Sequence, residues 1–339
     1  MLIAGGNSGT RNLLFMSNYN EIIELHNGVI AEREEDLIFG AGSDVVRPDI
    51  WTGVNKKDYL PSPERQSSRN FDTEGCVSYS LIETVELNFN RMKQIGLISD
   101  KTLKWLTDNG YFIGGELHLS DRFLVVMSNT SPTEGNSGTV VAQYAQTIGL
   151  APQSLCDWNG EGTQAQYYDK STISQKAIDT AKEWTKYFDV SSDWHRYNLG
   201  EWPEASKYGS LQVYTYAWFQ KGTKYYNPKP GTSNHAICMC DFDNVQIFDT
   251  YEPFIKTLTS WGDCLNFAQA TYLKDNNYND MSNVKIIKDT ASPKVYMCLP
   301  IADEASFQSY CDNFGIEMQK NADGSTNFSA MIDGSLTLS

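Results

Sequence analysis

The sequence lacks long uninterrupted apolar runs, and this absence argues against a membrane-spanning protein. Its longest runs, such as Phe123-Leu-Val-Val-Met127, fall far short of the ~20 residues that a spanning helix requires. Residues 1–16 show no basic start followed by an apolar stretch, so we expect no secretory signal.

Basic residues are also few. The 339-residue chain has 27 Lys and Arg against 42 Asp and Glu, which gives a formal net charge of −15. Proteins that bind nucleic acid or an anionic membrane surface need clustered Lys and Arg. We therefore expect neither nucleic acid nor a membrane as a partner.

Cysteine is sparse, with seven residues spread along the chain. A secreted disulfide scaffold would be shorter, denser in cysteine and usually even in number. The chain has no Cys-x-x-Cys pair, and on a strand His235 faces the opposite side from Cys238 and Cys240. We expect no metal site, and we expect most cysteines to be free buried thiols.

What the sequence does contain is typical of a globular α+β protein, with 40% apolar residues and many aromatic ones. Apolar side chains recur at helical spacing from Cys76 onward, and Gly96 is placed to end that helix. Further helices are expected over residues 100–108, 137–148 and 171–188. Strands are expected over residues 211–218, 235–240 and 245–250. A helical front half and a strand-rich back half predict two lobes with a cleft between them.

The same patterns divide the chain into three parts. Residues 1–60 are expected to be an N-terminal extension of short strands and loops, and residues 61–283 the main body. The polar run at 274–283 is typical of a linker. Beyond it, a hairpin over 284–300, a short helix over 303–314 and a polar tail would form a C-terminal extension, residues 284–339.

Three residues form a candidate catalytic group. Cys76 begins a helix, where unpaired backbone N–H groups favour a negative charge and should lower the pKa of a thiol. A nucleophilic thiol needs a base, and the base needs an orienting acceptor. His235 opens one strand and Asp249 ends the next, and residues 241–244 have turn character. The fold-back should bring Asp249 level with His235, so that one ring nitrogen binds the carboxylate and the other faces Cys76.

Five segments in chain order resemble motifs of papain-family cysteine peptidases. Glu74-Gly-Cys-Val-Ser-Tyr-Ser80 is similar to the family's Gly-x-Cys-Trp-Ala-Phe-Ser, and Asn234-His-Ala-Ile237 is similar to its Asp-His-Ala-Val. Ile247-Phe-Asp-Thr-Tyr-Glu252 resembles Lys-Asn-Ser-Trp-Gly. Between them, Leu119-Ser-Asp-Arg-Phe-Leu124 resembles Leu-Ser-Glu-Gln-x-Leu, and Gly135-Asn-Ser-Gly138 resembles an Asn-Gly-Gly turn.

The stretch from residue 62 to about residue 272 most resembles the divergent papain-like peptidases of tailed phages and some uncultivated bacteria. The resemblance implies a two-lobed fold, with a helical lobe and an antiparallel β-barrel-like lobe. It also implies a hydrolase, a thiol protease, that acts on a polypeptide without a cofactor. Location would be cytoplasmic or in a virion.

The resemblance also implies residue roles. Cys76 would be the nucleophile, His235 the acid–base and Asp249 the orienting residue. The backbone N–H of Cys76 and a Gln side chain would form the oxyanion hole. The family's Gln position is occupied by Asn70, whereas the nearest Gln is Gln66, ten residues before the cysteine. We favour Gln66 and leave Asn70 open.

The substrate groove would be lined by residues from the same motifs: Gly135, Asn136, Ser137, Asn234 and Tyr251. Tyr251 stands where the family has Trp and Glu252 where it has Gly, which bears on substrate preference more than on the reaction. Papain relatives often carry an N-terminal inhibitory segment. Residues 1–60 lack the long charged helix typical of such segments, so packing around the body is the expected role.

Two alternatives stay open. A Cys-His-Asp triad also serves peptidoglycan amidases and endopeptidases, so the substrate could be bacterial cell wall. The fold could also be a non-catalytic virion-associated part with a vestigial triad, although an intact triad argues against a relic.

Overall fold

The computed structural model describes residues 29–30, 47–67, 70–158 and 160–278, together with three later strands. The chain forms two compact units, Met1–Tyr278 and Asn279–Ser339. In the second unit β11 (Lys285–Lys288), β12 (Val295–Cys298) and β13 (Ala330–Ile332) form an antiparallel sheet in that order. The hairpin expected over 284–300 is therefore confirmed by β11 and β12. The helix expected over 303–314 and most of residues 1–46 lie outside the described residues.

Eight α-helices and three short 3₁₀ helices are described in the first unit. The α-helices are α1 (Cys76–Gln94), α2 (Asp100–Asp108), α3 (Asp121–Met127), α4 (Gly138–Ile148), α5 (Gln153–Cys156), α6 (Gln164–Tyr168), α7 (Gln175–Tyr187) and α8 (Glu201–Tyr208). The 3₁₀ helices are η2 (Lys56–Tyr59), η3 (Lys170–Thr172) and η4 (Trp261–Asp263). Ser99, Ser137 and Ser174 begin α2, α4 and α7, each with its side chain accepting a hydrogen bond from a backbone N–H of the first turn.

Ten strands are described in this unit. They are β1 (Phe112–Ile113), β2 (Glu116–Leu117), β3 (Phe188–Arg196), β4 (Ser210–Thr215), β5 (Phe219–Lys221), β6 (Lys224–Tyr226), β7 (His235–Asp241), β8 (Gln246–Phe248), β9 (Ile255–Thr257) and β10 (Cys264–Asp275). Six of them form an antiparallel sheet in the order β3-β10-β4-β7-β8-β9. The neighbours β4, β7 and β8 fix the register of the later site, with Thr215 opposite His235 and Cys238 opposite Phe248.

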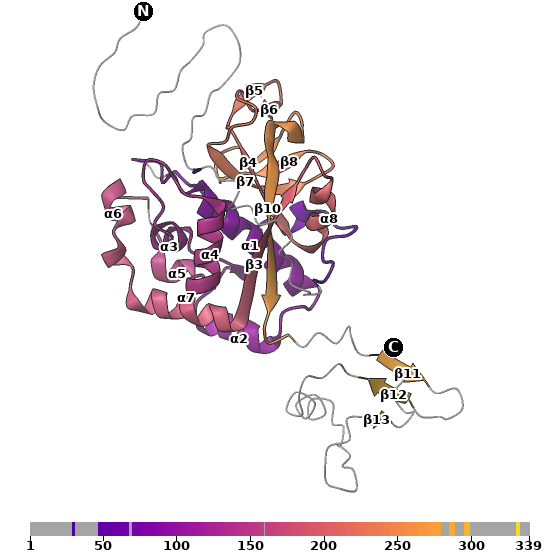
Figure 1. The fold of residues 1–339 in the computed structure, drawn as a ribbon. Coiled ribbons are helices and arrows are strands. Elements are labelled where there is room, and N and C mark those ends of the chain that lie inside the picture. The colour runs from indigo at the N-terminus through magenta and orange to yellow at the C-terminus, as the bar shows by residue number, and fades with distance from the viewer. Residues whose placement is uncertain are drawn as a thin grey trace, which may run out of the picture. The chain divides into compact units, whose positions relative to one another are not determined.

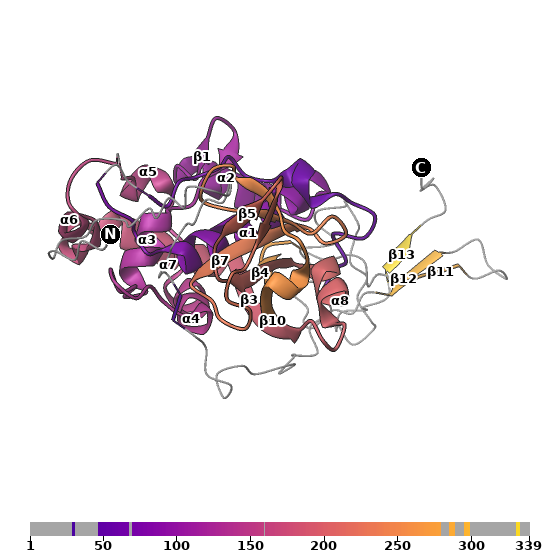
Figure 2. The same ribbon diagram turned by 90° about the horizontal axis from the view of Figure 1, so that it is seen from above.

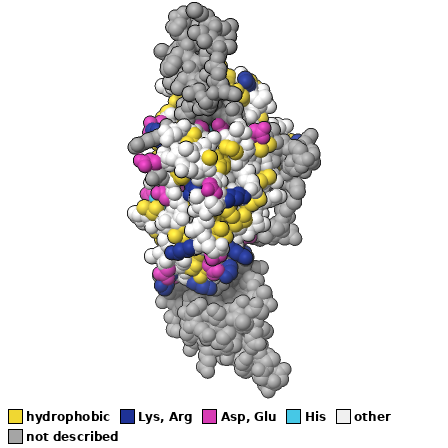
Figure 3. Space-filling model, turned by 90° about the vertical axis from the view of Figure 1, so that its left-hand side faces the viewer, with side chains coloured by type: hydrophobic (Ala, Val, Ile, Leu, Met, Phe, Trp, Pro, Cys, Tyr) yellow, Lys and Arg dark blue, Asp and Glu magenta, His cyan; other side chains and the backbone are white. Residues whose placement is uncertain are grey.

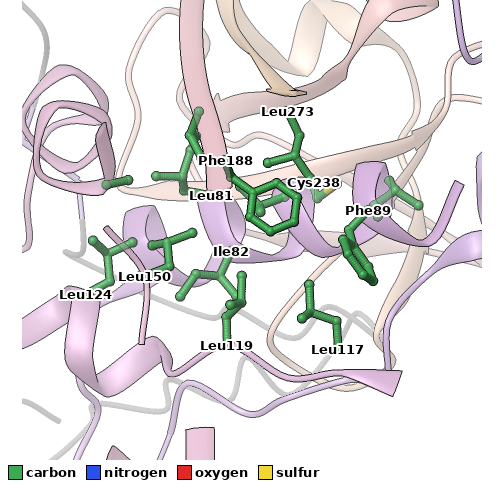
Figure 4. Close-up of a cluster of buried hydrophobic side chains, with 14 of the residues drawn as sticks. Leu81, Ile82, Phe89, Leu117, Leu119, Leu124, Leu150, Phe188, Cys238 and Leu273 are labelled. Atoms are coloured by element: carbon green, nitrogen blue, oxygen red, sulfur yellow. The ribbon is translucent and has the colours of Figure 1, made fainter. Parts of the chain in front are cut away.

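Helix α1 lies between the sheet and helices α3 and α4, whereas α8 packs against β3, β4 and β10 away from α1 (Figures 1 and 2). Nearly all of its length is buried, which the recurring apolar side chains predict. Figure 4 shows Leu81 and Ile82 of α1 among leucines from the helical side and Cys238 and Leu273 from the sheet. The predicted two-lobed α+β arrangement is therefore confirmed, and its two halves meet at α1.

The linker expected at 274–283 begins two residues too early, although the boundary between the two units, after Tyr278, falls within it. Residues 274 and 275 end the long strand β10. Asp275 is buried and accepts hydrogen bonds from Ser99 N at 2.7 Å and Thr102 Oγ1 at 2.8 Å. Its carboxylate binds the N-terminus of α2. A stretch of polar residues indicates a loop when only the sequence is known, so this tertiary contact could not be predicted.

Acidic and basic side chains are interspersed with apolar and uncharged polar ones on the face seen in Figure 3. Within the described residues, no helix combines the length and the apolar character that crossing a bilayer would require.

Candidate active site

Cys76 is the first residue of α1, and the chain makes a tight entry into that helix. Glu74 has a left-handed φ of 49°, and Gly75 follows it. A Cβ atom at position 75 would lie 2.7 Å from Cγ2 of Val125. Glycine therefore lets the chain approach α3 closely enough to place Cys76 at the helix start.

The sulfur of Cys76 faces the strand that begins with His235. The backbone N–H of Ala236, the next residue, lies close enough to that sulfur to lower the pKa of the thiol. Cys76 is fully buried. The first turn of α1 and the first residues of β7, far apart in sequence, thus meet at the thiol.

The thiol differs from the sequence expectation in its acidity. Burial raises the pKa of Cys76 well above its ordinary value, and the nearby backbone N–H of Ala236 lowers it only in part. The carboxylates of Glu74, Asp72 and Asp249 raise it further. The expectation of a lowered pKa considered only the helix terminus, whereas desolvation and nearby negative charge dominate here.

His235 and Asp249 are brought together as predicted. Nε2 of His235 lies 2.8 Å from Oδ1 of Asp249, and both side chains are fully buried. Antiparallel pairing of β7 with β8 carries the chain back past the turn at 241–244, so Asp249 arrives just beyond the end of β8. The Trp218 ring stands edge-on to the imidazole, with centroids 6.4 Å apart.

A fourth residue, Lys256, was not found from the sequence. Its Nζ lies 2.8 Å from Oδ2 of Asp249 and donates to the carbonyl oxygen of Tyr251 at 2.6 Å. Trp218 Nε1 also donates to Oδ2, at 3.1 Å. Burial opposes ionisation of Asp249, yet Lys256 and His235 outweigh it and hold the pKa of the carboxyl below its ordinary value.

Gln66 and Asn70 occupy different surroundings. Gln66 is fully buried, donates from Nε2 to Asp72 Oδ1 at 2.8 Å and accepts from the hydroxyl of Thr250 at 3.4 Å. Asn70 is exposed and donates to the carbonyl of Gly162 at 3.1 Å. The structure thus places Gln66 beside the residue that follows Asp249.

Tyr251 contacts two parts of this group. Its ring centroid lies 5.7 Å from that of His235, and its hydroxyl donates to Oδ2 of Asp72. Residues 249, 250 and 251 therefore contact His235, Gln66 and Asp72 in turn, through one side chain each.

The remaining candidates, Gly135, Asn136, Ser137 and Asn234, make contacts that shape the segments that carry them. Asn136 is buried, and its amide nitrogen donates to Ser128 and Thr130. Gly135 has a positive φ of 74° beside it, and Ser137 caps α4. The main-chain oxygen of Asn136 accepts from the N–H of Ile30 at 2.8 Å. Across the sheet, Oδ1 of Asn234 accepts from the N–H of Ala217 at 2.9 Å.

A cavity of about 350 Å³ opens beside Gln66 and Thr73. Neither Cys76 nor His235 is among the residues that line it. In the described part of the chain, no group of three or more His, Cys, Asp and Glu side chains is placed to hold a metal ion.

No protein-family model and no curated protein matches the sequence. Solved structures do show similarity. The chain is similar to the cysteine protease and lectin-like domains of Cwp84, a surface-layer-associated protein of Clostridium difficile, with 17% identity and a TM-score of 0.47, over 80% of this chain and 61% of that one. It is similar to the Carica candamarcensis cysteine protease CMS1MS2, with 14% identity and a TM-score of 0.41, over 66% of this chain and 98% of that one. Procathepsin L2 of Tenebrio molitor shows 15% identity and a TM-score of 0.41, over 78% of each chain.

Proposed function

We propose that this chain is a cysteine peptidase that hydrolyses peptide bonds through Cys76, His235 and Asp249. The observation that carries the proposal is the packing of α1 against β7, which brings Cys76 and Ala236 into one buried cluster, next to a histidine whose Nε2 is bound to Asp249. Because Asp249 takes Nε2, Nδ1 is the nitrogen that would exchange a proton with the thiol.

The proposed reaction has two halves. His235 accepts the thiol proton while sulfur bonds to the carbonyl carbon of the substrate, and the carbonyl electrons move to oxygen. The imidazolium then protonates the amine as the C–N bond breaks, which leaves a thioester. Water, deprotonated by the same imidazole, hydrolyses it and restores the thiol. No step needs a cofactor.

The oxyanion hole is proposed to combine the backbone N–H of Cys76 with Nε2 of Gln66. A helix-start N–H has no intrahelical acceptor, so it can donate to a developing negative charge. The contacts of Gln66 with Asp72 and Thr250 support its choice over Asn70, because they fix which way the carboxamide points.

We further propose a polypeptide substrate, bound along Gly135, Asn136 and Ser137 on one side and near Asn234 and Tyr251 on the other. We also propose that the chain is of the phage type, which the order of the motifs in the sequence supports. The same proposal divides the chain into an N-terminal extension (residues 1–60), a peptidase body (61–283) and a C-terminal extension (284–339).

The test compares wild type with Cys76→Ala on two substrates, a denatured polypeptide and purified bacterial cell wall. We expect cleavage of the polypeptide by wild type alone. Release of cell-wall fragments instead would establish the peptidoglycan alternative. Identical behaviour of the two proteins on both substrates would contradict any catalytic role for Cys76.

A further inference from the structure

Asp249 is shared between two nitrogen-bearing side chains, one on each carboxylate oxygen. Oδ1 binds His235 and Oδ2 binds Lys256, both at 2.8 Å, and all three side chains are fully buried. We propose that Lys256 is a positioning residue that offsets the charge of Asp249, so that the resting site holds a neutral thiol and a neutral imidazole. This inference rests on the proposed function.

Lys256 is held firmly in this place. Its strand, β9, buries Lys256 while the neighbouring Ile255 is exposed. Besides Asp249, its ammonium contacts the carbonyl of Tyr251, and it stands 5.6 Å from the ring centre of Tyr225. A buried cation needs a close counter-charge. Among the described residues, Asp249 provides that charge for Lys256.

The electrostatic consequence follows from distance. An isolated carboxylate next to an imidazole stabilises the imidazolium, and thereby a thiolate–imidazolium pair. Here an ammonium at the same distance on the other oxygen opposes that effect, because a proton added to His235 is repelled by Lys256 while it is attracted by Asp249. Asp249 then orients the ring without strongly charging it.

Other titratable groups face this pair from the elements packed around it. They are Cys76 and Glu83 of α1, Asp72 and Glu74 just before it, Tyr225 of β6, and Tyr251 after β8. Burial raises the pKa of Glu83 well above its ordinary value, which favours its uncharged form. Asp72 and Glu74 add negative charge on the thiol side, which disfavours a thiolate. These groups therefore oppose the thiolate, and Lys256 is the charge that opposes the imidazolium.

The first chemical step changes accordingly. With a neutral resting pair, the proton leaves sulfur for Nδ1 of His235 while the sulfur lone pair forms the bond to the carbonyl carbon. Charge separation develops only as the oxyanion forms, where donors can stabilise it. Proton transfer and attack are therefore coupled rather than sequential.

The test follows the protonation of Cys76 directly. Thiolate absorbance near 240 nm and the rate of alkylation by iodoacetamide are measured against pH, with Cys76→Ala as the blank. In wild type we expect both to rise only above neutral pH. In Lys256→Met, which keeps an aliphatic stem, we expect the alkylation limb to shift down by about one pH unit, which is about tenfold faster alkylation at a given pH on that limb.

Two further variants, Asp249→Asn and the double variant Asp249→Asn/Lys256→Met, complete a double-mutant cycle with wild type and Lys256→Met. The single variant leaves an unpaired ammonium near His235 and should lower turnover further than the double variant, in which both charges are gone. A purely structural role for Lys256 would not shift the pH limb.

Two results would overturn the proposal: a wild-type thiolate plateau below pH 6, or superimposable pH profiles for wild type and Lys256→Met. The first needs no variant, so misfolding cannot obscure it. Failure of the proposed function would be seen separately, as an absence of polypeptide cleavage by wild type.

Discussion

The side-chain amide of Gln66 donates a hydrogen bond to Asp72 at 2.8 Å, and the other oxygen of Asp72 accepts from the hydroxyl of Tyr251. One carboxylate thus holds both the proposed oxyanion donor and the aromatic ring beside His235. Thr250 fixes the opposite end of the Gln66 carboxamide. The donor is oriented before any substrate arrives, which is what transition-state stabilisation requires.

Loss of Gln66 should act on turnover rather than on binding. We expect Gln66→Ala to lower kcat about 10²-fold to 10³-fold with little change in KM, as removal of one oxyanion donor does elsewhere. Asp72→Ala, which removes the positioning contact, should cost about tenfold. Steady-state kinetics on one peptide substrate give both values. Asn70→Ala is the matched control, and a loss of kcat there as large as that of Gln66→Ala would assign the oxyanion donor to Asn70.

Removing the carboxylate of Asp249 should strongly affect stability. Asp249→Asn leaves the ammonium of Lys256 buried without its counter-charge, and breaking one side of a buried pair costs about 3–5 kcal/mol. On the sequence alone we would expect this variant to keep its fold and part of its activity. Lys256 changes that expectation, because the carboxylate of Asp249 also neutralises the buried ammonium of Lys256.

Chemical denaturation near neutral pH measures this loss. The folded-state pKa of Asp249 lies below its unfolded value, so its contribution is present above about pH 4 and is lost as pH falls through the folded value. The gap between wild type and Asp249→Asn should therefore narrow in acid. Lys186→Met, which breaks an exposed pair with Glu183, is the control and should change stability by less than about 1 kcal/mol. A similarly small loss for Asp249→Asn would contradict the prediction.

Much of the site could be predicted from local patterns. The apolar period that starts after Cys76 fixed the helix and its first residue, and the turn at 241–244 fixed a strand pair. Two adjacent antiparallel strands lie about 5 Å apart, so pairing of these strands predicts that His235 and Asp249 lie close together. These inferences need only neighbours in sequence.

The rest depended on contacts made by the whole fold. Lys256 is a single basic residue on a three-residue strand. Its role can be inferred only from its burial against Asp249 and Tyr225 in the folded protein. The pKa of Cys76 was misjudged for the same reason, because burial is a tertiary property. Asp275 looked like part of a linker until α2 was seen to begin on its carboxylate.

Glu83 should make stability fall as pH rises. Its two carboxyl oxygens are buried and have no hydrogen-bond partner among the described residues, and burial raises its pKa well above the ordinary value. A group with a raised folded pKa contributes stability below its unfolded pKa of about 4.3 and loses it as pH rises toward the folded value. Glu83→Gln cannot ionise, so it should gain on wild type by about 1.4 kcal/mol per pH unit in that window.

Free energies of unfolding of wild type and Glu83→Gln, measured at intervals from pH 4 to pH 8, test this. The curves should coincide at the acid end and separate above it. Glu204→Gln is the control, because Glu204 is exposed and its pKa is lowered by its contacts with Lys207 and Tyr208. Parallel curves for wild type and Glu83→Gln would mean that Glu83 is ionised in the folded protein, stabilised by Lys256.

Ile30 offers a test of whether the N-terminal region restrains the site. Val29 forms a parallel bridge with Asn136, and the N–H of Ile30 donates to the main-chain oxygen of Asn136, on the segment where we propose that substrate binds. Ile30→Pro removes the N–H that donates to Asn136, whereas Ile30→Ala keeps it. Loss of one backbone hydrogen bond of about 1 kcal/mol would open the contact about fivefold more often. If this contact limits access to the buried thiol, alkylation of Cys76 and peptide hydrolysis should both accelerate by that factor in Ile30→Pro alone. Equal rates in wild type and both variants would show that residues 29–30 do not restrain the proposed groove. Acceleration in Ile30→Ala as well would assign the effect to the side chain of Ile30 instead of the backbone hydrogen bond.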